Sequence, residues 1–129
     1  MNLTKKDILQ FSGAFPTLPK GSERYNYAMA FNFRRLLPTF QELSIELNPS
    51  PRYREYAAKL QADPNGSHDE YAEEIALHRQ KVLDRPTILA ETVEVTLRTV
   101  DYTDAPISEL TPAQLAAIMP MINEKEEEV

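Results

Sequence analysis

The chain of 129 residues contains no cysteine. This absence excludes disulfide bonds, thiolate catalysis and zinc sites with sulfur ligands. Its three glycines are widely scattered, so the chain has no glycine-rich loop of the kind that cradles phosphate groups. No apolar run approaches the roughly 20 residues that span a membrane, and the N-terminus lacks the apolar stretch of a secretory signal. We therefore expect a cytoplasmic protein without a membrane segment.

The chain also lacks an excess of basic residues. Its formal net charge is −6 at pH 7, whereas broad nucleic-acid binding normally requires a basic domain. Residues 124–129 contain four glutamates and one lysine, and we expect them to form a disordered acidic tail. Residues 1–123 are enough for a single helical domain with its own core, and the hydrophobic content of 42% suits a soluble globular protein.

The longest pattern is helical and runs from Ser22 to Leu47. Its apolar residues follow one another at steps of 4, 3, 4, 3 and 4, namely Met29, Phe33, Leu36, Phe40, Leu43 and Leu47. This spacing predicts one helix whose apolar seam is covered by a partner helix. Pro38 lies off the seam, so we expect it to kink the helix without ending it, although it cannot donate to the carbonyl of Arg34.

Shorter helices are predicted on both sides of this stretch. A first helix begins at the Thr4 capping box and ends at Gly13 in a left-handed cap. Pro49 and Pro51 favour a real break before a helical pattern over residues 52–61. After the turn signal at residues 63–66, a third helix capped by Ser67 runs back antiparallel and ends at residues 84–86. A last helix begins with Thr111-Pro112-Ala113-Gln114, and its inward face is expected to carry Leu115, Ile118 and Met119.

In residues 91–98 the apolar residues no longer follow the helical spacing of three or four, because apolar and polar side chains alternate strictly. This alternation predicts a half-buried strand. Residues 15–19 and 100–107 are poor partners for it, so we expect the strand to pair with its copy in a second chain. That pairing makes a homodimer or higher oligomer with an interface formed by Val93, Val95 and Leu97.

The predicted fold class is therefore mainly α with a minor β element. It comprises an antiparallel helical hairpin, one or two short strands and a short C-terminal helix.

A basic and aromatic set is the candidate ligand site. Its members are Arg24, Tyr25, Tyr27, Arg34, Arg35, Arg52, Tyr53 and Arg54. Arginine forks match phosphate groups and tyrosines stack on bases, so this set could bind a nucleotide or another anion. The plainer interpretation, which we favour, is pairing with nearby glutamates and half-buried tyrosines.

Metal and catalytic chemistry have little support. Glu74 and His78 lie four residues apart on one helix face, a spacing that can chelate a metal. Further ligands would have to come from His68 and Asp69, so we interpret His78 as a packing residue and expect no metal site. No nucleophile motif or cofactor motif is present either, and we expect a protein that is not an enzyme and has no cofactor.

Several segments together resemble a known group of proteins. These segments are Tyr25–Asn32, the turn Asp63–Gly66, the strand residues Val93 and Val95, and Leu110–Leu115. The layout resembles small proteins of unassigned function from tailed phages and prophages. That resemblance implies a phage or prophage accessory protein that acts by binding something. The partners that we expect are a second copy of the chain, a host or virion protein, or a small nucleotide. Two alternatives stay open: sequestration of a nucleotide signal used in host defence, and a role in virion assembly or as a chaperone.

Overall fold

The computed structural model describes residues 1–123, so the predicted acidic tail at 124–129 lies outside the described part. Five α-helices and four short strands alternate with 3-10 turns. The helices are α1 (Lys5–Ala14), α2 (Glu23–Leu47), α3 (Pro51–Ala62), α4 (Ala72–Ala90) and α5 (Pro112–Ile118). The strands are β1 (Asn2–Thr4), β2 (Thr92–Glu94), β3 (Val100–Asp101) and β4 (Ile122–Asn123). None of the described helices is both long and apolar enough to cross a membrane.

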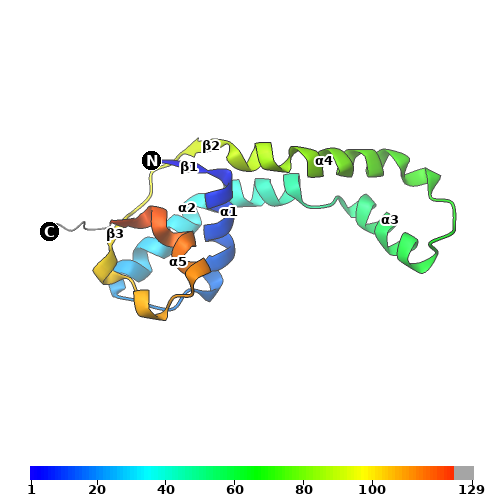
Figure 1. The fold of residues 1–129 in the computed structure, drawn as a ribbon. Coiled ribbons are helices and arrows are strands. Elements are labelled where there is room, and N and C mark those ends of the chain that lie inside the picture. The colour runs from blue at the N-terminus through cyan, green and yellow to red at the C-terminus, as the bar shows by residue number, and fades with distance from the viewer. Residues whose placement is uncertain (124–129) are drawn as a thin grey trace.

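These elements form a compact body and a projecting arm (Figure 1). The body contains α1, α5, the short strands and the N-terminal part of α2. The arm, defined as residues 48–85, contains α3 and most of α4. Helix α4 runs back antiparallel to α2 (Figure 1), and the Lys81 ammonium donates to the Ile45 and Asn48 carbonyls. The predicted antiparallel hairpin in a mainly helical fold is thereby confirmed.

The seam of α2 lies in the core, as the sequence predicts. Met29, Leu36 and Leu43 are buried, and the other three seam residues pack against the same cluster while remaining partly exposed. Helix α1 supplies Ile8 and Phe11 to this cluster. The 4-3 spacing therefore identified the buried face of the longest helix correctly.

Prolines affect the helices in three different ways. Pro38 lies inside α2, which continues through it as predicted. Pro51 begins α3, where the Ser50 hydroxyl accepts the Tyr53 amide, so the predicted break before α3 is also confirmed. The predicted end of α4 near Pro86 is wrong, because α4 continues to Ala90. The extra turn carries Ile88 onto the core cluster, and this tertiary packing compensates for the amide that proline lacks.

Three other predictions about helices are wrong. Gly13 does not end α1, which continues to Ala14 without any left-handed residue. Ser67 does not cap α4, since a 3-10 turn over Asp69–Tyr71 precedes it and buries Tyr71. Met119 points outward and Met121 is buried instead, because a 3-10 turn replaces the helix after Ile118. In each case a 3-10 turn adjoins the end of the α-helix and shifts that end away from the capping or stop residue that predicted it.

Of the strand predicted over residues 91–98 only Thr92–Glu94 forms a strand, β2, and it pairs within its own chain. β2 is antiparallel to β1, with Leu3 opposite Val93, and the Val95 amide donates to the Met1 carbonyl over 2.9 Å. The prediction that a second copy supplies this partner strand is therefore wrong. The proposed interface residues Val93, Val95 and Leu97 are half-buried against the chain's own core cluster. β3 and β4 form a second, parallel pair.

Candidate functional site

The side of α2 that faces away from the core carries a second stripe. Tyr27 lies nine residues, or about two and a half turns, before Leu36 and therefore on the opposite side of the helix. From Tyr27 the steps of 4, 3, 4, 3 and 4 repeat through Phe31, Arg34, Pro38, Gln41 and Ile45. Tyr27 is 57% exposed and Ile45 is 78% exposed. Large apolar side chains thus face solvent along the outside of α2.

An open groove lies beside the N-terminal half of this stripe. It has a volume of about 480 Å³ and is lined by Phe15, Tyr27, Ala30, Phe31, Phe33, Arg34 and Leu37. The ring of Phe15 stacks on Phe33 with centroids 4.3 Å apart, which ties the loop after α1 to α2. We call this feature the outer groove. Its lining is mainly apolar and aromatic, as expected of a binding surface for organic groups.

Arg98 covers the aromatic rim of the outer groove. Its guanidinium carbon lies 5.2 Å from the Tyr27 ring centroid and 4.7 Å from that of Phe31. The Asn32 side chain fixes the Arg98 backbone, donating to its carbonyl and accepting from its amide, both over 2.8 Å. Asn32 is 0% exposed, whereas Arg98 is exposed, so the amide side of this double hydrogen bond is buried on α2. A buried clamp on α2 thereby sets where the arginine stacks.

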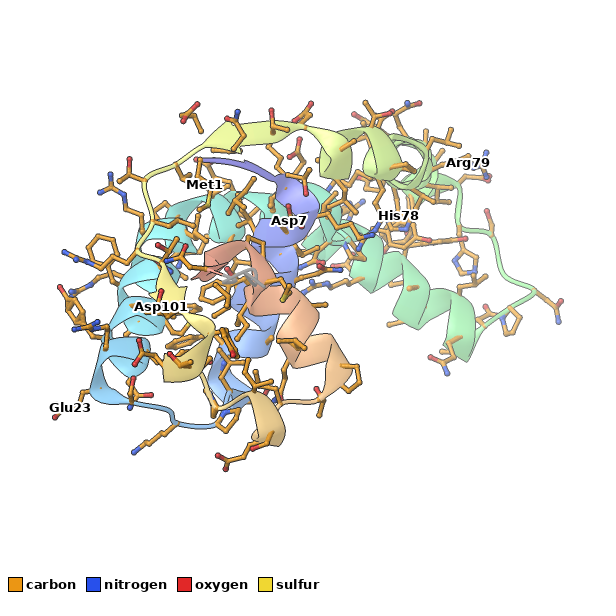
Figure 2. The ribbon with its side chains drawn as sticks, turned by 60° about the vertical axis from the view of Figure 1, so that its left-hand side comes forward. Met1, Asp7, Glu23, His78, Arg79 and Asp101 are labelled. Carbon is orange, nitrogen blue, oxygen red and sulfur yellow. The ribbon has the colours of Figure 1, made fainter. Side chains whose placement is uncertain are left out.

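The surroundings of the outer groove are basic, although the whole chain is acidic. Four exposed arginines lie on or beside this face: Arg24, Arg34, Arg35 and Arg98. None of them forms an ion pair within residues 1–123, where the basic partners in ion pairs are the N-terminus, Lys5, Arg52 and Lys59. Glu23 lies one turn before Tyr27 and points outward at the start of α2 (Figure 2). Around its apolar centre the face thus carries four arginines without a described ion pair and one glutamate, Glu23.

The structure divides the predicted ligand site into two groups and removes one residue. Tyr27 and Arg34 meet at the outer groove, with Arg24 and Arg35 on its flank. Tyr25 is 1% exposed and belongs to the core; its hydroxyl has no partner among the described residues, and burial raises its pKa. Sequence analysis missed Phe31 and Arg98. Phe31 could have been found from its place four residues after Tyr27, whereas nothing local indicates Arg98.

The second group, Arg52, Tyr53 and Arg54, lies on α3 in the arm. Leu37 at the near end of the outer groove lies ten residues before the end of α2 at Leu47, which is about 15 Å along the helix axis, and α3 begins only after that. The predicted residues therefore do not share one pocket. Arg52 pairs with Glu55 and Glu74. Burial lowers the pKa of Arg52, but its hydrogen bond to Glu74 and the nearby negative charges outweigh this and raise the pKa overall.

Tyr71 organises the arm. It is 0% exposed, and its hydroxyl donates to Glu55 over 2.8 Å. Arg52 and Lys59 lie over its ring, 4.7 Å and 5.3 Å from the centroid. Tyr53 stacks on His78 with ring centroids 3.9 Å apart. These contacts hold α3 against α4, so the side chains of this cluster have a structural role.

The histidines and nearby acids do not assemble a metal centre in the described part of the chain. No group of three or more His, Asp or Glu residues among residues 1–123 is placed to hold a metal ion. His78 faces α3, whereas Arg79 points outward (Figure 2). The His78 Nδ1 and Glu74 Oε2 atoms are buried without a described partner. The stacking of His78 on Tyr53 agrees with its interpretation as a packing residue.

Comparisons with family models, with curated proteins and with solved structures gave no match for this chain. The outer groove is therefore interpreted from its own geometry and chemistry.

Proposed function

We propose that this protein is a non-enzymatic interaction protein that binds another protein through the outer groove. The observation that carries the proposal is the exposed Tyr27, which lies with Phe31 under the Arg98 guanidinium beside an apolar groove. Tyrosine and arginine are the residues that most often dominate binding energy at protein interfaces. Because Asn32 holds the Arg98 backbone in place, a partner does not have to order this backbone when it binds.

Self-association and a phage or prophage origin remain part of the proposal. The origin rests on the resemblance of four segments alone. Self-association is supported by apolar side chains that face solvent on the arm and near it, namely Ile45, Leu77, Val82 and Leu83. Exposed apolar side chains gathered on one projection are typical of contact surfaces. Light scattering over a range of concentrations measures the oligomeric state; a monomer mass at high protein concentration would contradict self-association.

The interaction can be tested with matched bait proteins in an extract of the cells that express the gene. We expect Phe31→Ala combined with Arg98→Ala to abolish retention of the specific partner. The control is Tyr102→Ala, which removes another exposed aromatic side chain outside the groove. Circular dichroism must show that both variants are folded. Equal retention by the groove variant and the control would contradict the proposal.

A second candidate function is binding of a nucleotide or similar anion at the same face. It is favoured by the stacking of Arg98 on two aromatic rings beside Arg34, because aromatic faces accept bases and arginines accept phosphates. A nucleotide at 100 times its Kd stabilises a folded protein by about 2.7 kcal/mol. Thermal unfolding with a panel of mononucleotides and cyclic dinucleotides should then show an increase in Tm that Arg34→Ala removes. No increase with any of them would count against this candidate and leave the protein partner.

A further inference from the structure

We propose that the outer groove binds an acidic segment of the partner protein, a short stretch in which glutamates or aspartates flank large apolar side chains. The inference rests on the proposed function and specifies the chemistry of the partner. Such a segment matches two features of the groove. One is its apolar lining, and the other is a set of arginines that form no ion pair within residues 1–123.

The lining requires apolar groups from the partner. Phe15, Phe33 and Leu37 line the groove and are only half-buried, so part of their apolar surface meets solvent. Covering that surface is favourable by roughly 25 cal/mol for each Å² removed from water. A segment made only of charged residues would lose hydration against these side chains without gaining a hydrogen bond there. The partner must therefore supply at least one large apolar side chain.

Two arginines at the groove require acceptors. Arg34 belongs to the lining, and the Arg98 guanidinium lies over the rings of Tyr27 and Phe31. A ring face attracts the charge of a guanidinium but offers its N–H groups no strong acceptor. Carboxylates accept from these N–H groups in a bidentate geometry. Acidic side chains next to the apolar ones would therefore satisfy both arginines.

Acidic residues of α2 and its neighbours do not neutralise this charge. Glu23 begins α2, and Asp104 accepts from the Ser22 hydroxyl beside it over 3.3 Å. Arg34 lies eleven residues after Glu23 and eight before Glu42, about 16 Å and about 12 Å along the helix axis. Both separations exceed the screening length of about 8 Å at physiological ionic strength. A basic partner segment would thus be repelled at Arg34, whereas an acidic one is attracted.

The size of the groove fits a short peptide segment. Tyr27 and Leu37 bound its lining along α2 and lie ten residues apart, about 15 Å along the axis. A helical segment of about ten residues or an extended one of about five spans this length. A nucleic acid would carry phosphates beyond the groove, where a chain with a net charge of −6 repels them. A few carboxylates on a peptide therefore suit this face better than a nucleic-acid strand.

A library of random peptides displayed on yeast, with the full chain as target, measures this preference directly. We expect the enriched peptides to carry a large apolar residue and at least two acidic ones, because each of the two arginines can take a carboxylate. One enriched peptide is then synthesised with a fluorescent label, and its Kd is measured by anisotropy. Raising the salt concentration from about 50 mM to about 500 mM should weaken binding several-fold, because exposed charges are screened.

Charge reversal provides the specific test. Arg34→Glu should weaken binding of the acidic peptide at least about tenfold, since like charges then face each other. Exchanging the acidic residues of the peptide for lysines should restore binding to Arg34→Glu and abolish binding to the original protein. The matched control is Arg79→Glu combined with Arg85→Glu, which reverses two exposed charges on α4 and should leave Kd unchanged. Circular dichroism must show that every variant is folded.

Three results would overturn the inference: enrichment of basic or uncharged peptides, no enrichment at all, or an equal loss of affinity in the control. If basic or uncharged peptides bind and Phe31→Ala with Arg98→Ala abolishes their binding, the proposed function stands and this inference alone fails. If acidic peptides bind that groove variant as well as the original protein, they bind elsewhere and the inference fails too. Binding of a labelled single-stranded oligonucleotide, or a dimer mass by light scattering, without any enriched peptide would assign the face to a nucleic acid or to a second copy instead.

Discussion

Replacing Asn32 by alanine should destabilise the protein more than any other single polar substitution on α2. Asn32 is fully buried, and its side chain makes two hydrogen bonds of 2.8 Å to the Arg98 backbone, 66 residues along the chain. Truncation leaves one amide and one carbonyl without their partner. An unsatisfied buried group costs about 1–3 kcal/mol, so two such groups give an expected loss of about 2–6 kcal/mol in the free energy of unfolding. The melting temperature should then fall by roughly 10 °C or more.

Asn26 provides a matched control for this substitution. It is the same residue type on the same helix, and it also clamps a backbone, accepting from the Gly21 amide over 2.9 Å and donating to its carbonyl over 3.2 Å. Asn26 is only half-buried and Gly21 is only five residues away. Water can replace the lost bonds, so we expect Asn26→Ala to cost about 1 kcal/mol.

The assay is urea unfolding followed by circular dichroism. The slope of the free energy against urea should be the same in all three proteins, because the same surface is exposed on unfolding. A loss below about 1 kcal/mol for Asn32→Ala, or equal losses at Asn32 and Asn26, would refute the reasoning that burial of the clamp gives it its stabilising effect. If the reasoning holds, Asn32→Ala should also weaken partner binding, because Arg98 is no longer fixed over Tyr27.

Three further predictions follow from single contacts. Tyr71→Phe removes the hydrogen bond to Glu55 and should lower the free energy of unfolding by about 1–2 kcal/mol, with faster hydrogen exchange confined to the arm; unchanged exchange would contradict this. Tyr25→Phe should be neutral or slightly stabilising at pH 7, since the hydroxyl has no described partner. Burial raises the pKa of Tyr25 from its usual value of 10.0, so above pH 10 the hydroxyl ionises more readily in the unfolded chain than in the folded one. The free energy of unfolding is therefore unaffected by this group below pH 10 and declines as pH rises through the folded-state pKa. In urea titrations from pH 9 to pH 12 the free energy of unfolding of Tyr25→Phe should fall less than that of the original protein. An equal fall in both proteins would show that the pKa of Tyr25 is not raised in the folded state. Leu36→Ala should cost about 2–5 kcal/mol, whereas Ile45→Ala, on the exposed side of the same helix, should cost less than about 0.5 kcal/mol; similar costs would mean that the two faces of α2 are assigned wrongly.

Features that depend on neighbouring residues could be predicted from the sequence. The 4-3 spacing identified α2 and its buried seam because a helix places such residues on one side wherever it packs. The side-chain caps at Thr4 and Thr111 could be predicted for the same reason, since each hydroxyl accepts the amide three residues later. The predominantly helical class followed from these local signals.

Only the tertiary structure decided which distant segments meet. The strand at Thr92–Glu94 pairs with Asn2–Thr4. A segment of three residues is too short to show the alternating pattern from which a strand is predicted. Helix α4 passes Pro86 because Ile88 reaches the core, a gain that the local sequence does not contain. In the same way Arg98 completes the outer groove through the Asn32 clamp, while Tyr25, chemically suited to a ligand site, lies inside. Helices and caps are set by residues a few positions apart, whereas strand partners and binding faces depend on contacts between residues far apart in the chain, and no short pattern specifies those contacts.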